Sequence, residues 1–397
     1  MPGTLAVLLL VLAQAGSEEI ERLGSDDPAV REQAEKRLVD LGSKGEPLLR
    51  KALTDGSPEV RARAERLLRL LEPSILFINL GDVWVTDLRG MKPVRIGHAE
   101  LDIGGAWGRP DGRTFAFVIR DELRLRDLVT GEERSVLKLD RGSIDRFEWS
   151  PDGRRALIST RQPHRIYALN VETGEKTRPD IDRPWAREYV WSPDGTRIAA
   201  IDRDGGGQQY DVALLNGEGN FLRRVSKDGG SKSDLRWSGD GTKVAYVVTV
   251  ADAAHPEGHA INVAILTLET GAVRTVTSDR RLLFSPSWSP DGGQVTFLRA
   301  VRLFGENPLV QDYDLCIARS DGSELRVLRS GGSSSQTPVW SPDGRYILFG
   351  ESSKDDQGTL FFSAGVIRPD GTDYKQIKGS NGYVHYATWI PSRYLKK

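Results

Sequence analysis

The sequence has very little cysteine and no excess of charge of either sign. Its 397 residues include one cysteine, Cys316, which excludes an internal disulfide and a cysteine-rich zinc site. Lys and Arg together number 55 against 56 Asp and Glu, so the formal net charge is -1. A chain with almost no net charge does not bind a polyanion or an anionic membrane through electrostatic attraction alone. We therefore expect no nucleic-acid partner.

Motifs of common catalytic sites are also absent from the sequence. It contains no Gly-x-Ser-x-Gly elbow, no His-Glu-x-x-His pair and no phosphate-binding loop. His255 and His259 are four residues apart, but Pro256 and Gly258 oppose the helix that would place them on one face. We predict no catalytic residue, no metal and no cofactor.

Long hydrophobic runs are missing, and the longest one lies at the amino terminus. Leu5–Leu12 is too short to cross a bilayer as a helix, which needs about 20 residues. Ala13-Gln14-Ala15 follows, with the small residues at the first and third positions that are typical of a secretory cleavage site. We predict a signal peptide over residues 1–15, a mature chain that begins at Gly16, no transmembrane segment in that chain, and a periplasmic or secreted location. An uncleaved apolar tail is the alternative.

Residues 16–72 are rich in helix-forming residues and repeat after 30 positions. Pro28, Val30, Arg31, Ala34, Glu35, Leu38 and Leu41 recur as Pro58, Val60, Arg61, Ala64, Glu65, Leu68 and Leu71. Each proline suits the first turn of a helix, with Asp27 and Ser57 before it as N-cap candidates. The segment resembles a HEAT or armadillo-like helical repeat of about one and a half units.

Such a fragment is shorter than the roughly three units that a helical solenoid needs to bury its apolar face. Its leucine stripe is therefore expected to pack on the following domain or to dock a partner. Four arginines between Arg61 and Arg69 suggest a phosphate site, but Glu59, Glu65 and Glu72 are interleaved with them. This pattern favours a solvated face.

Residues 75–391 contain a second, longer repeat that is marked by tryptophan. Seven of the nine tryptophans recur at spacings of 42, 42, 46, 51, 52 and 49 residues, each at the end of a short β-rich run. They are Trp107, Trp149, Trp191, Trp237, Trp288, Trp340 and Trp389. Four-stranded units of about 40 to 50 residues are typical of β-propeller blades. We expect these tryptophans to pack between blades as structural residues of the repeat.

A tight turn follows most of the seven tryptophans. Ser-Pro-Asp-Gly is intact at 150–153, 192–195, 289–292 and 341–344. Proline presets the first corner of a turn, aspartate bonds to its own backbone and glycine adopts the left-handed conformation. Because Asp152 and its equivalents recur in blade after blade, we interpret them as turn residues and not as metal ligands.

A second series of seven glycine turns is offset from the tryptophans by one position, because its first member precedes Trp107. We therefore predict that residues 75–96 form the outer strands of a blade whose innermost strand is Tyr383–Trp389. The predicted fold is mainly β, a seven-bladed propeller closed by both ends of the ring, with a small helical segment before it. A six-bladed ring is the alternative.

The Trp-Ser-Pro-Asp-Gly units resemble the TolB-type, WD40-like propeller repeat, known as PD40, over residues 75–391. The resemblance implies a protein of the bacterial envelope that binds other proteins. TolB proteins have six blades and an α/β domain before them, whereas this chain has seven repeats and a HEAT-like segment.

The predicted binding residues break the repeat and lie on the face opposite the conserved turns, where the loops are longest. Binding residues concentrate on such loops, and an exposed tryptophan between arginines is typical of an interface. The candidates are Arg183, Trp185, Arg187, His255, His259, Arg280, Arg302 and Phe304. Packing of Trp185 on a neighbouring loop is the alternative for that residue.

We interpret the chain as an exported, monomeric, non-enzymatic binding or scaffolding module for a protein of the cell envelope. Two alternatives stay open. One is an extracytoplasmic enzyme or a propeller that binds a small ligand or glycan, which a cluster of perturbed carboxylates or histidines confined to one or two blades would favour. The other is a structural surface module that binds nothing small.

Overall fold

The computed structural model describes most of the chain, and the chain divides into two compact units. The described residues are 18–40, 45–79, 82–88, 93–98, 103–110, 114–119, 121–127, 130–139, 144–160, 165–177, 188–203, 210–253, 258–277, 283–301, 313–332, 337–354, 360–377, 384 and 386–391. One unit comprises residues 1–74, 87–90 and 390–397, and the other comprises 75–86 and 91–389. Each unit is described by itself.

The first unit is helical, with α2 (Pro28–Asp40), α3 (Glu46–Asp55) and α4 (Pro58–Leu71). Asp27 Oδ1 accepts a hydrogen bond from the Ala29 amide at 2.8 Å, and Ser57 Oγ accepts one from the Val60 amide at 3.3 Å. Both predicted caps thus satisfy amide groups that have no partner within the first turn of a helix.

The leucine stripe of the helical unit packs among its own helices. Leu38 of α2, Leu49 of α3 and Leu67 of α4 are buried in a single cluster with Leu23. The helix α3 supplies contacts that the 30-residue repeat did not reveal, so Leu38 has its partners inside the unit. Packing of the rest of the stripe on the following domain or on a partner stays a prediction. On the outer surface, Glu35 pairs with Arg63 at 3.2 Å and with Arg66, as a solvated face requires.

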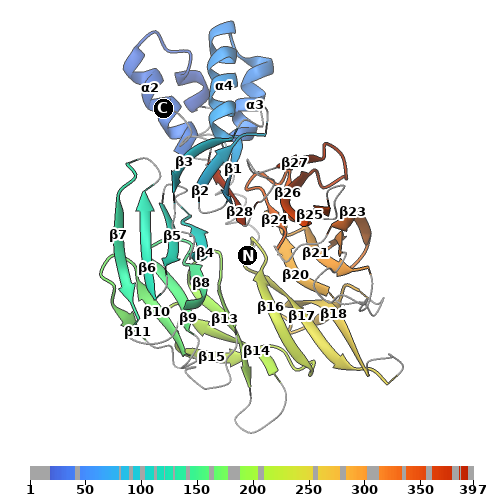
Figure 1. Cartoon of the computed structure of the whole chain (residues 1–397). Coiled ribbons are helices and arrows are strands. Elements are labelled where there is room, and N and C mark those ends of the chain that lie inside the picture. Colours follow the sequence, from blue (N-terminus) through green and yellow to red (C-terminus); the bar gives the residue numbers. More distant parts are fainter. Residues whose placement is uncertain are drawn as a thin grey trace. The chain divides into compact units, whose positions relative to one another are not determined.

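The second unit consists of seven four-stranded antiparallel sheets, which we number as blades 1 to 7 (Figure 1). Blades 1 to 4 contain, from the inner strand outward, β28 (Tyr386–Pro391), β1 (Pro73–Asn79), β2 (Asp82–Thr86) and β3 (Val94–His98); β4 (Ile103–Gly108), β5 (Thr114–Ile119), β6 (Glu122–Asp127) and β7 (Glu133–Lys138); β8 (Ile144–Trp149), β9 (Arg155–Thr160), β10 (Arg165–Asn170) and β11 (Lys176–Thr177); and β12 (Tyr189–Trp191), β13 (Arg197–Arg203), β14 (Tyr210–Asn216) and β15 (Phe221–Arg224).

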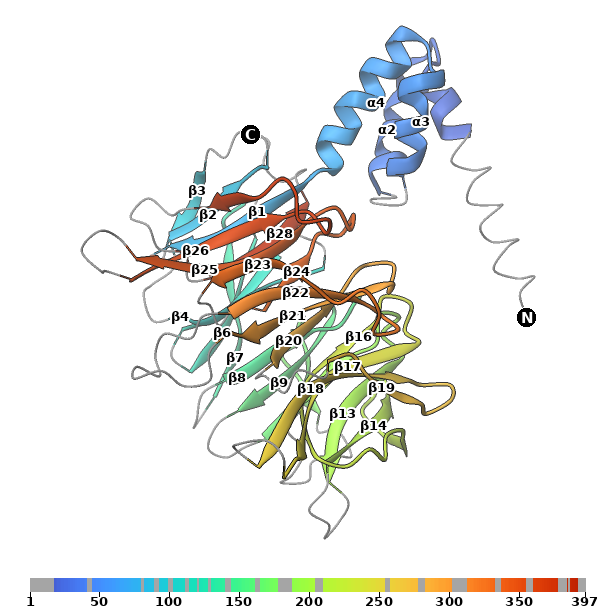
Figure 2. The ribbon, with the colours of Figure 1, turned by 90° about the vertical axis from the view of Figure 1, so that its right-hand side faces the viewer.

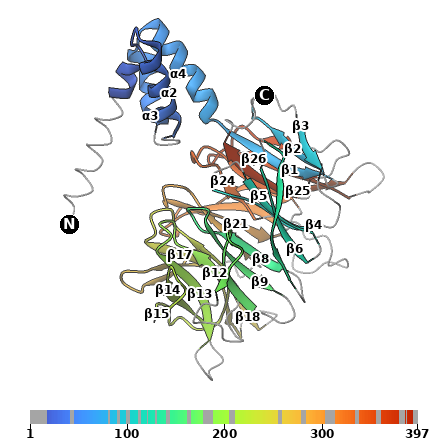
Figure 3. The same ribbon diagram turned by 90° about the vertical axis from the view of Figure 1, so that its left-hand side faces the viewer.

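Blades 5 to 7 follow the same order. They contain β16 (Ser231–Trp237), β17 (Lys243–Ala251), β18 (His259–Thr267) and β19 (Val273–Thr275); β20 (Leu283–Trp288), β21 (Gln294–Ala300), β22 (Tyr313–Arg319) and β23 (Arg326–Gly332); and β24 (Val339–Trp340), β25 (Ile347–Lys354), β26 (Leu360–Ile367) and β27 (Lys375–Ile377). The sheets of blades 5 and 6 are labelled in Figure 2, and the sheet of blade 4 in Figure 3.

The seven-bladed ring predicted from the repeat is confirmed. In blade 1 the last strand of the chain, β28, pairs with β1, so one sheet combines both ends of the propeller sequence. Inner strands of successive blades contact each other, as β4 contacts β8 and β16 contacts β20. Closing the circle in this way leaves no open end of the ring at blade 1 or blade 7.

The seven repeat tryptophans lie at or within two residues of the end of the inner strands and pack against the neighbouring blade. All except Trp107 are nine-tenths or more buried. Trp237 Nε1 donates to the Val190 carbonyl of blade 4 at 3.0 Å, and Trp389 Nε1 donates to the Val339 carbonyl of blade 7 at 2.9 Å. An arginine of the preceding blade covers the ring in places, as Arg155 lies 4.7 Å from the Trp191 centroid.

The Ser-Pro-Asp-Gly turns are held by hydrogen bonds of their own side chains. Ser150 Oγ donates to Asp152 Oδ1 at 2.6 Å and accepts from the Arg155 amide at 2.9 Å, while Gly153 has φ of +67°. The hydroxyl of Ser150 is the main group that holds the pKa of Asp152 below its usual value. These contacts give the repeated aspartates a function within the turn.

Candidate functional site

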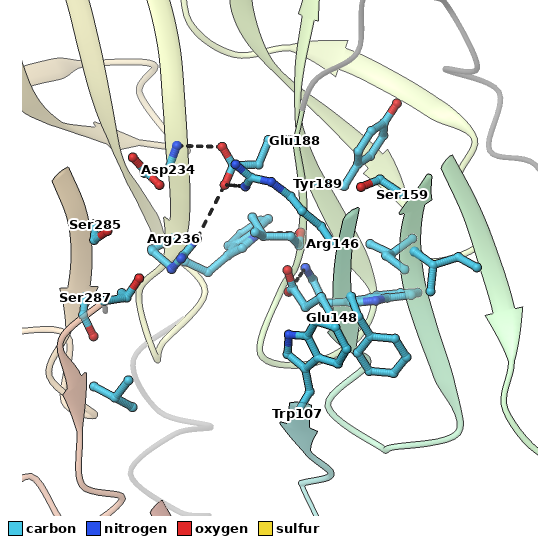
Figure 4. Close-up of a pocket in the computed structure, with 18 of the residues that line it drawn as sticks. Trp107, Arg146, Glu148, Ser159, Glu188, Tyr189, Asp234, Arg236, Ser285 and Ser287 are labelled. Carbon is cyan, nitrogen blue, oxygen red and sulfur yellow. Dashed lines mark hydrogen bonds and ion pairs between the residues drawn. The ribbon is translucent and has the colours of Figure 1, made fainter. Parts of the chain in front are cut away.

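A cavity of about 830 Å³ lies among the inner strands of the propeller, and we call it the axial cavity (Figure 4). Residues of the inner strands β4, β8, β12, β16, β20, β24 and β28, of β9 and β10 in blade 3, and of the segment that leads into β12 line it. Every blade thus contributes to its wall through its inner strand. A cavity of this size is in the range of ligand sites in proteins, about 300 to 1,000 Å³.

The lining residues occupy equivalent places in the repeat, one and three residues before each tryptophan. Side chains alternate between the faces of a strand, so these two positions share a face. In blades 3 and 5 both positions hold charged residues, in blade 4 they hold Glu188 and Val190, and in blades 6 and 7 they hold Ser, Thr or Val. The charged members are Arg146, Glu148, Glu188, Asp234 and Arg236.

β-Bulges in several inner strands redirect these side chains. The register between β16 and β17 shifts between Ser233 and Arg236, and the register between β20 and β21 shifts between Phe284 and Ser287. Asp234 and Ser285, inside the two bulges, both have φ of +56°. An extra residue of this kind bends the strand and changes the direction of its side chains, and such features recur beside functional sites.

Glu188 lies at the centre of the charged group and connects three blades (Figure 4). Its side chain is 4 % exposed. Its Oε1 accepts from Arg146 Nη1 of blade 3 at 2.8 Å and lies 3.6 Å from Arg236 Nη1 of blade 5, and its Oε2 accepts from the Asp234 amide at 2.6 Å. Burial raises the pKa of Glu188, and the two guanidinium groups act in the opposite direction.

Glu148 lies beside this group and has a different environment. Its Oε1 accepts a hydrogen bond from the Trp191 amide at 2.9 Å, which connects blade 3 to blade 4. Burial raises the pKa of Glu148 to about 7, and the charge of Glu188 contributes to the same rise. Arg146, Arg236 and the Trp191 amide lower it less than burial raises it. A carboxyl group of this kind changes its charge near neutral pH.

Uncharged polar groups complete the wall of the cavity. Ser159 of β9 lines it, is buried, and its hydroxyl has no hydrogen-bond partner among the described residues. Ser285, Ser287 and Thr337 lie on the side of blades 6 and 7. A buried hydroxyl without a partner is costly in a folded protein, which makes Ser159 an unsatisfied polar group beside the cavity.

The binding residues that we predicted on the loop-rich face lie almost entirely outside the described part of the chain. Seven of the eight, Arg183, Trp185, Arg187, His255, Arg280, Arg302 and Phe304, lie outside the described residues. The eighth, His259, is half-buried at the start of β18, pairs with Ala251 across the sheet, and is not among the residues that line the axial cavity. That binding face stays a prediction.

The residues of the axial cavity were missed because we searched the loops for departures from the repeat. The signal was present in the inner strands, where the positions one and three residues before each tryptophan change from charged residues to uncharged ones around the ring. Two carboxyl groups with raised pKa, Glu148 of blade 3 and Glu188 of blade 4, meet the condition that we set for the alternative of an enzyme or a ligand-binding propeller.

Neither a metal cluster nor a membrane-crossing helix is found in the described ranges. No group of three or more His, Cys, Asp or Glu side chains there is arranged to hold a metal ion. No described helix is both long and apolar enough to cross a membrane. Cys316 is buried in the core between blades 5 and 6.

Comparison with known proteins identifies relatives in the same class of repeat. The chain is 30% identical over 152 residues to "Uncharacterized peptidase YuxL" of Bacillus subtilis, covering 37% of this chain and 22% of that protein. It is 22% identical over 279 residues to "Tol-Pal system protein TolB" of Francisella tularensis subsp. mediasiatica, covering 69% of this chain and 60% of that protein. The chain therefore spans less than two thirds of the length of these relatives.

Solved structures share the fold at low sequence identity. An oligogalacturonate lyase in complex with manganese superposes with a TM-score of 0.55 at 16% identity, covering 74% of this chain and 84% of that one. The family model described as the TolB beta propeller domain matches residues 81–302, more than half of the sequence. Since that match covers most of the blades, the chain belongs to the TolB β-propeller domain family.

Proposed function

We propose that the chain is an extracytoplasmic, non-enzymatic binding module and that a segment of a protein partner enters its axial cavity. The observation that carries this proposal is the charged group of blades 3 to 5, because it is the part of the inner wall that departs from the repeat. Glu188 is held by donors from both neighbouring blades, so the charged side chains around it are fixed in advance of binding.

Several further points support a protein partner in the envelope. The relatives include a "Tol-Pal system protein TolB", and the first fifteen residues read as an export signal. Aromatic and aliphatic side chains such as Phe147, Leu157 and Val190 border the charged group. A cavity with apolar walls and a few fixed polar groups suits a peptide segment. We propose that the module acts as a monomer.

Site-directed photo-cross-linking tests the proposal. A photoreactive amino acid in place of Ser287, which lines the axial cavity, should form an adduct with a partner protein of the source's envelope extract. The same amino acid in place of Lys138, on the exposed outer strand β7, is the matched control. An adduct at Ser287 that maps to one segment of one protein supports the function, and equal labelling from both positions contradicts it.

An enzyme is the second candidate, and a specific observation favours it. Glu148 has a pKa of about 7 and Glu188 a raised pKa, and carboxyl groups tuned in this way serve as general acids and bases. A peptidase and a lyase are among the similar proteins. Turnover of peptide or oligogalacturonate substrates that is present in the parent and lost in Glu148→Gln would favour the enzyme over the binding module.

A further inference from the structure

We propose that the axial cavity holds a carboxylate subsite, in which Arg146 and Arg236 bind an acidic side chain of the entering peptide while Glu148 takes up a proton. This inference rests on the proposed function and names the chemistry that the cavity recognises. It depends on four ionisable groups that inner strands of three consecutive blades bring to the same wall.

The buried carboxylate of Glu188 lies beside both arginines and leaves part of each arginine side chain exposed. Arg146 and Arg236 both approach Oε1 of Glu188, at 2.8 and 3.6 Å, so one negative charge stands between two positive charges. The side chain of Arg146 is 55% exposed and that of Arg236 is 35% exposed, whereas Glu188 is 4% exposed. Glu188 therefore holds the guanidinium groups in place from behind, and these groups present donors to the cavity. This arrangement suits a second carboxylate.

Glu148 determines how much of that positive charge is available. When Glu148 is ionised, three acidic groups on this wall, Glu148, Glu188 and Asp234, face the two arginines. When Glu148 is protonated, two acidic groups face two arginines, so the excess negative charge that would repel an anion is removed. Because an approaching anion repels the ionised form of Glu148, binding and protonation favour each other. Because the pKa of Glu148 is raised to about 7, the uptake of that proton costs little free energy at neutral pH.

The other groups that face this wall set the remaining requirements. Asp234 of β16 is the acidic group that opposes an anion, and it lies near enough to Glu188 to raise the pKa of that residue. The unpartnered hydroxyl of Ser159, buried at the same cavity, supplies a donor or acceptor to the ligand. Leu157 and Ile166 next to it are apolar, so a peptide fits this environment better than a sugar with hydroxyls on every face.

Isothermal titration with matched peptides tests this inference. The probes are a capped Gly-Ser-Glu-Ser-Gly peptide, the same peptide with Gln in place of Glu, and trigalacturonate as a non-peptide carboxylate. The parent should bind the Glu peptide in preference to the Gln peptide. Its affinity should fall about tenfold between about pH 6 and about pH 8, as expected when protonation of a group with a pKa of about 7 is linked to binding.

Four variants locate the effect. Arg146→Gln should abolish the preference for Glu over Gln, and Glu148→Gln should bind with equal affinity at both pH values. Asp234→Asn, which tolerates the positive φ at this position, should strengthen binding at both pH values and retain the pH dependence. Arg134→Gln, an exposed arginine on the outer strand β7, is the control and should match the parent.

The results that overturn the inference are equally defined. Equal binding of the Glu and Gln peptides, a pH dependence that persists in Glu148→Gln, or no binding of the Glu peptide by Glu148→Gln would each refute the subsite. Tighter binding of trigalacturonate than of the peptide would overturn the peptide assignment. An unchanged cross-link at Ser287 in Arg146→Gln would refute the subsite and leave the proposed function in place, whereas probe binding without any cross-link would refute the partner.

Discussion

Arg146 Nη1 lies 2.8 Å from Glu188 Oε1, so an ion pair in the axial cavity joins the inner strands of blades 3 and 4. The same carboxylate accepts a hydrogen bond from the Asp234 amide of blade 5. One buried residue thus connects three consecutive blades at the place where the wall of the cavity departs from the repeat, and stability and recognition depend on the same side chain.

Removal of the buried carboxylate should destabilise the ring. Glu188→Ala removes the acceptor that Arg146 Nη1 and the Asp234 amide share, and the loss of such hydrogen bonds costs about 1 to 3 kcal/mol of unfolding free energy. Urea unfolding followed by tryptophan fluorescence measures it. Glu172→Ala, which removes an exposed partner of Arg134, is the control and should cost less than about 1 kcal/mol. Equal losses in both variants would contradict the role of Glu188.

Stability should depend on pH through Glu148. Its pKa rises from 4.5 to about 7 on folding, so the folded protein holds more protons than the unfolded chain between these values. The free energy of unfolding therefore decreases as the pH rises from about 4.5 to about 7, by up to about 3 kcal/mol. Glu188, whose pKa is also raised, acts in the same direction.

The variant Glu148→Gln isolates that contribution, because it removes the titrating group and keeps its shape. Urea unfolding of the parent and of this variant at several pH values should show a smaller decrease in the variant. A parent whose stability increases over this interval, or a variant with an unchanged slope, would show that Glu148 is not the group responsible.

The repeat tryptophans should differ in what their indole nitrogens contribute. Trp237 Nε1 donates to the Val190 carbonyl, whereas the buried Nε1 of Trp191 has no hydrogen-bond partner among the described residues. Trp237→Phe should therefore lose about 1 to 2 kcal/mol more stability than Trp191→Phe. Calorimetric melting measures this difference, and a larger loss in Trp191→Phe would contradict it.

Truncation of a repeat tryptophan should be costly whatever its hydrogen bond. Trp191 is 5% exposed and contacts Arg155 of the preceding blade. Trp191→Ala should cost about 3 to 5 kcal/mol, because a cavity remains between two blades that cannot close on it. An unchanged melting temperature would exclude the packing role.

The buried serine of the repeated turn should contribute to stability. Ser150 Oγ bonds to Asp152 and to the Arg155 amide within one turn. Ser150→Ala should cost about 1 to 3 kcal/mol of unfolding free energy. It should also raise the pKa of Asp152, which that hydroxyl lowers. Carbon NMR titration of the carboxyl group measures the second effect, and an unchanged Asp152 titration would contradict it.

Local chemistry made much of the fold predictable. Several features depend on contacts within a few residues or on a period that the sequence repeats seven times. They are the Ser-Pro-Asp-Gly turns, the caps Asp27 and Ser57, and the seven spaced tryptophans. The offset between the two series of turns also predicted that β28 would complete the sheet of β1. Such features can be predicted from the sequence because each depends on residues that are close to it in the chain.

The candidate site was less predictable, because it combines residues that are far apart in sequence. Arg146 and Arg236 lie in blades 3 and 5, and nothing local to either predicts that both approach the carboxylate of Glu188. The raised pKa of Glu148 likewise depends on burial by a neighbouring blade. In the helical unit, part of the leucine cluster comes from α3, which lies outside the 30-residue repeat, so the repeat alone did not predict those contacts.

The sequence by itself determined the class of this protein: the type of turn, the number of blades, the way the ring closes and the apolar period of its helices. Each of these follows from backbone preferences and from the burial of one face of a strand or helix. Only the tertiary structure decided which charged side chains meet, which of them lose their water, and how their pKa values shift. Those properties depend on distances across blades, because desolvation and Coulomb interactions act through space and not along the chain.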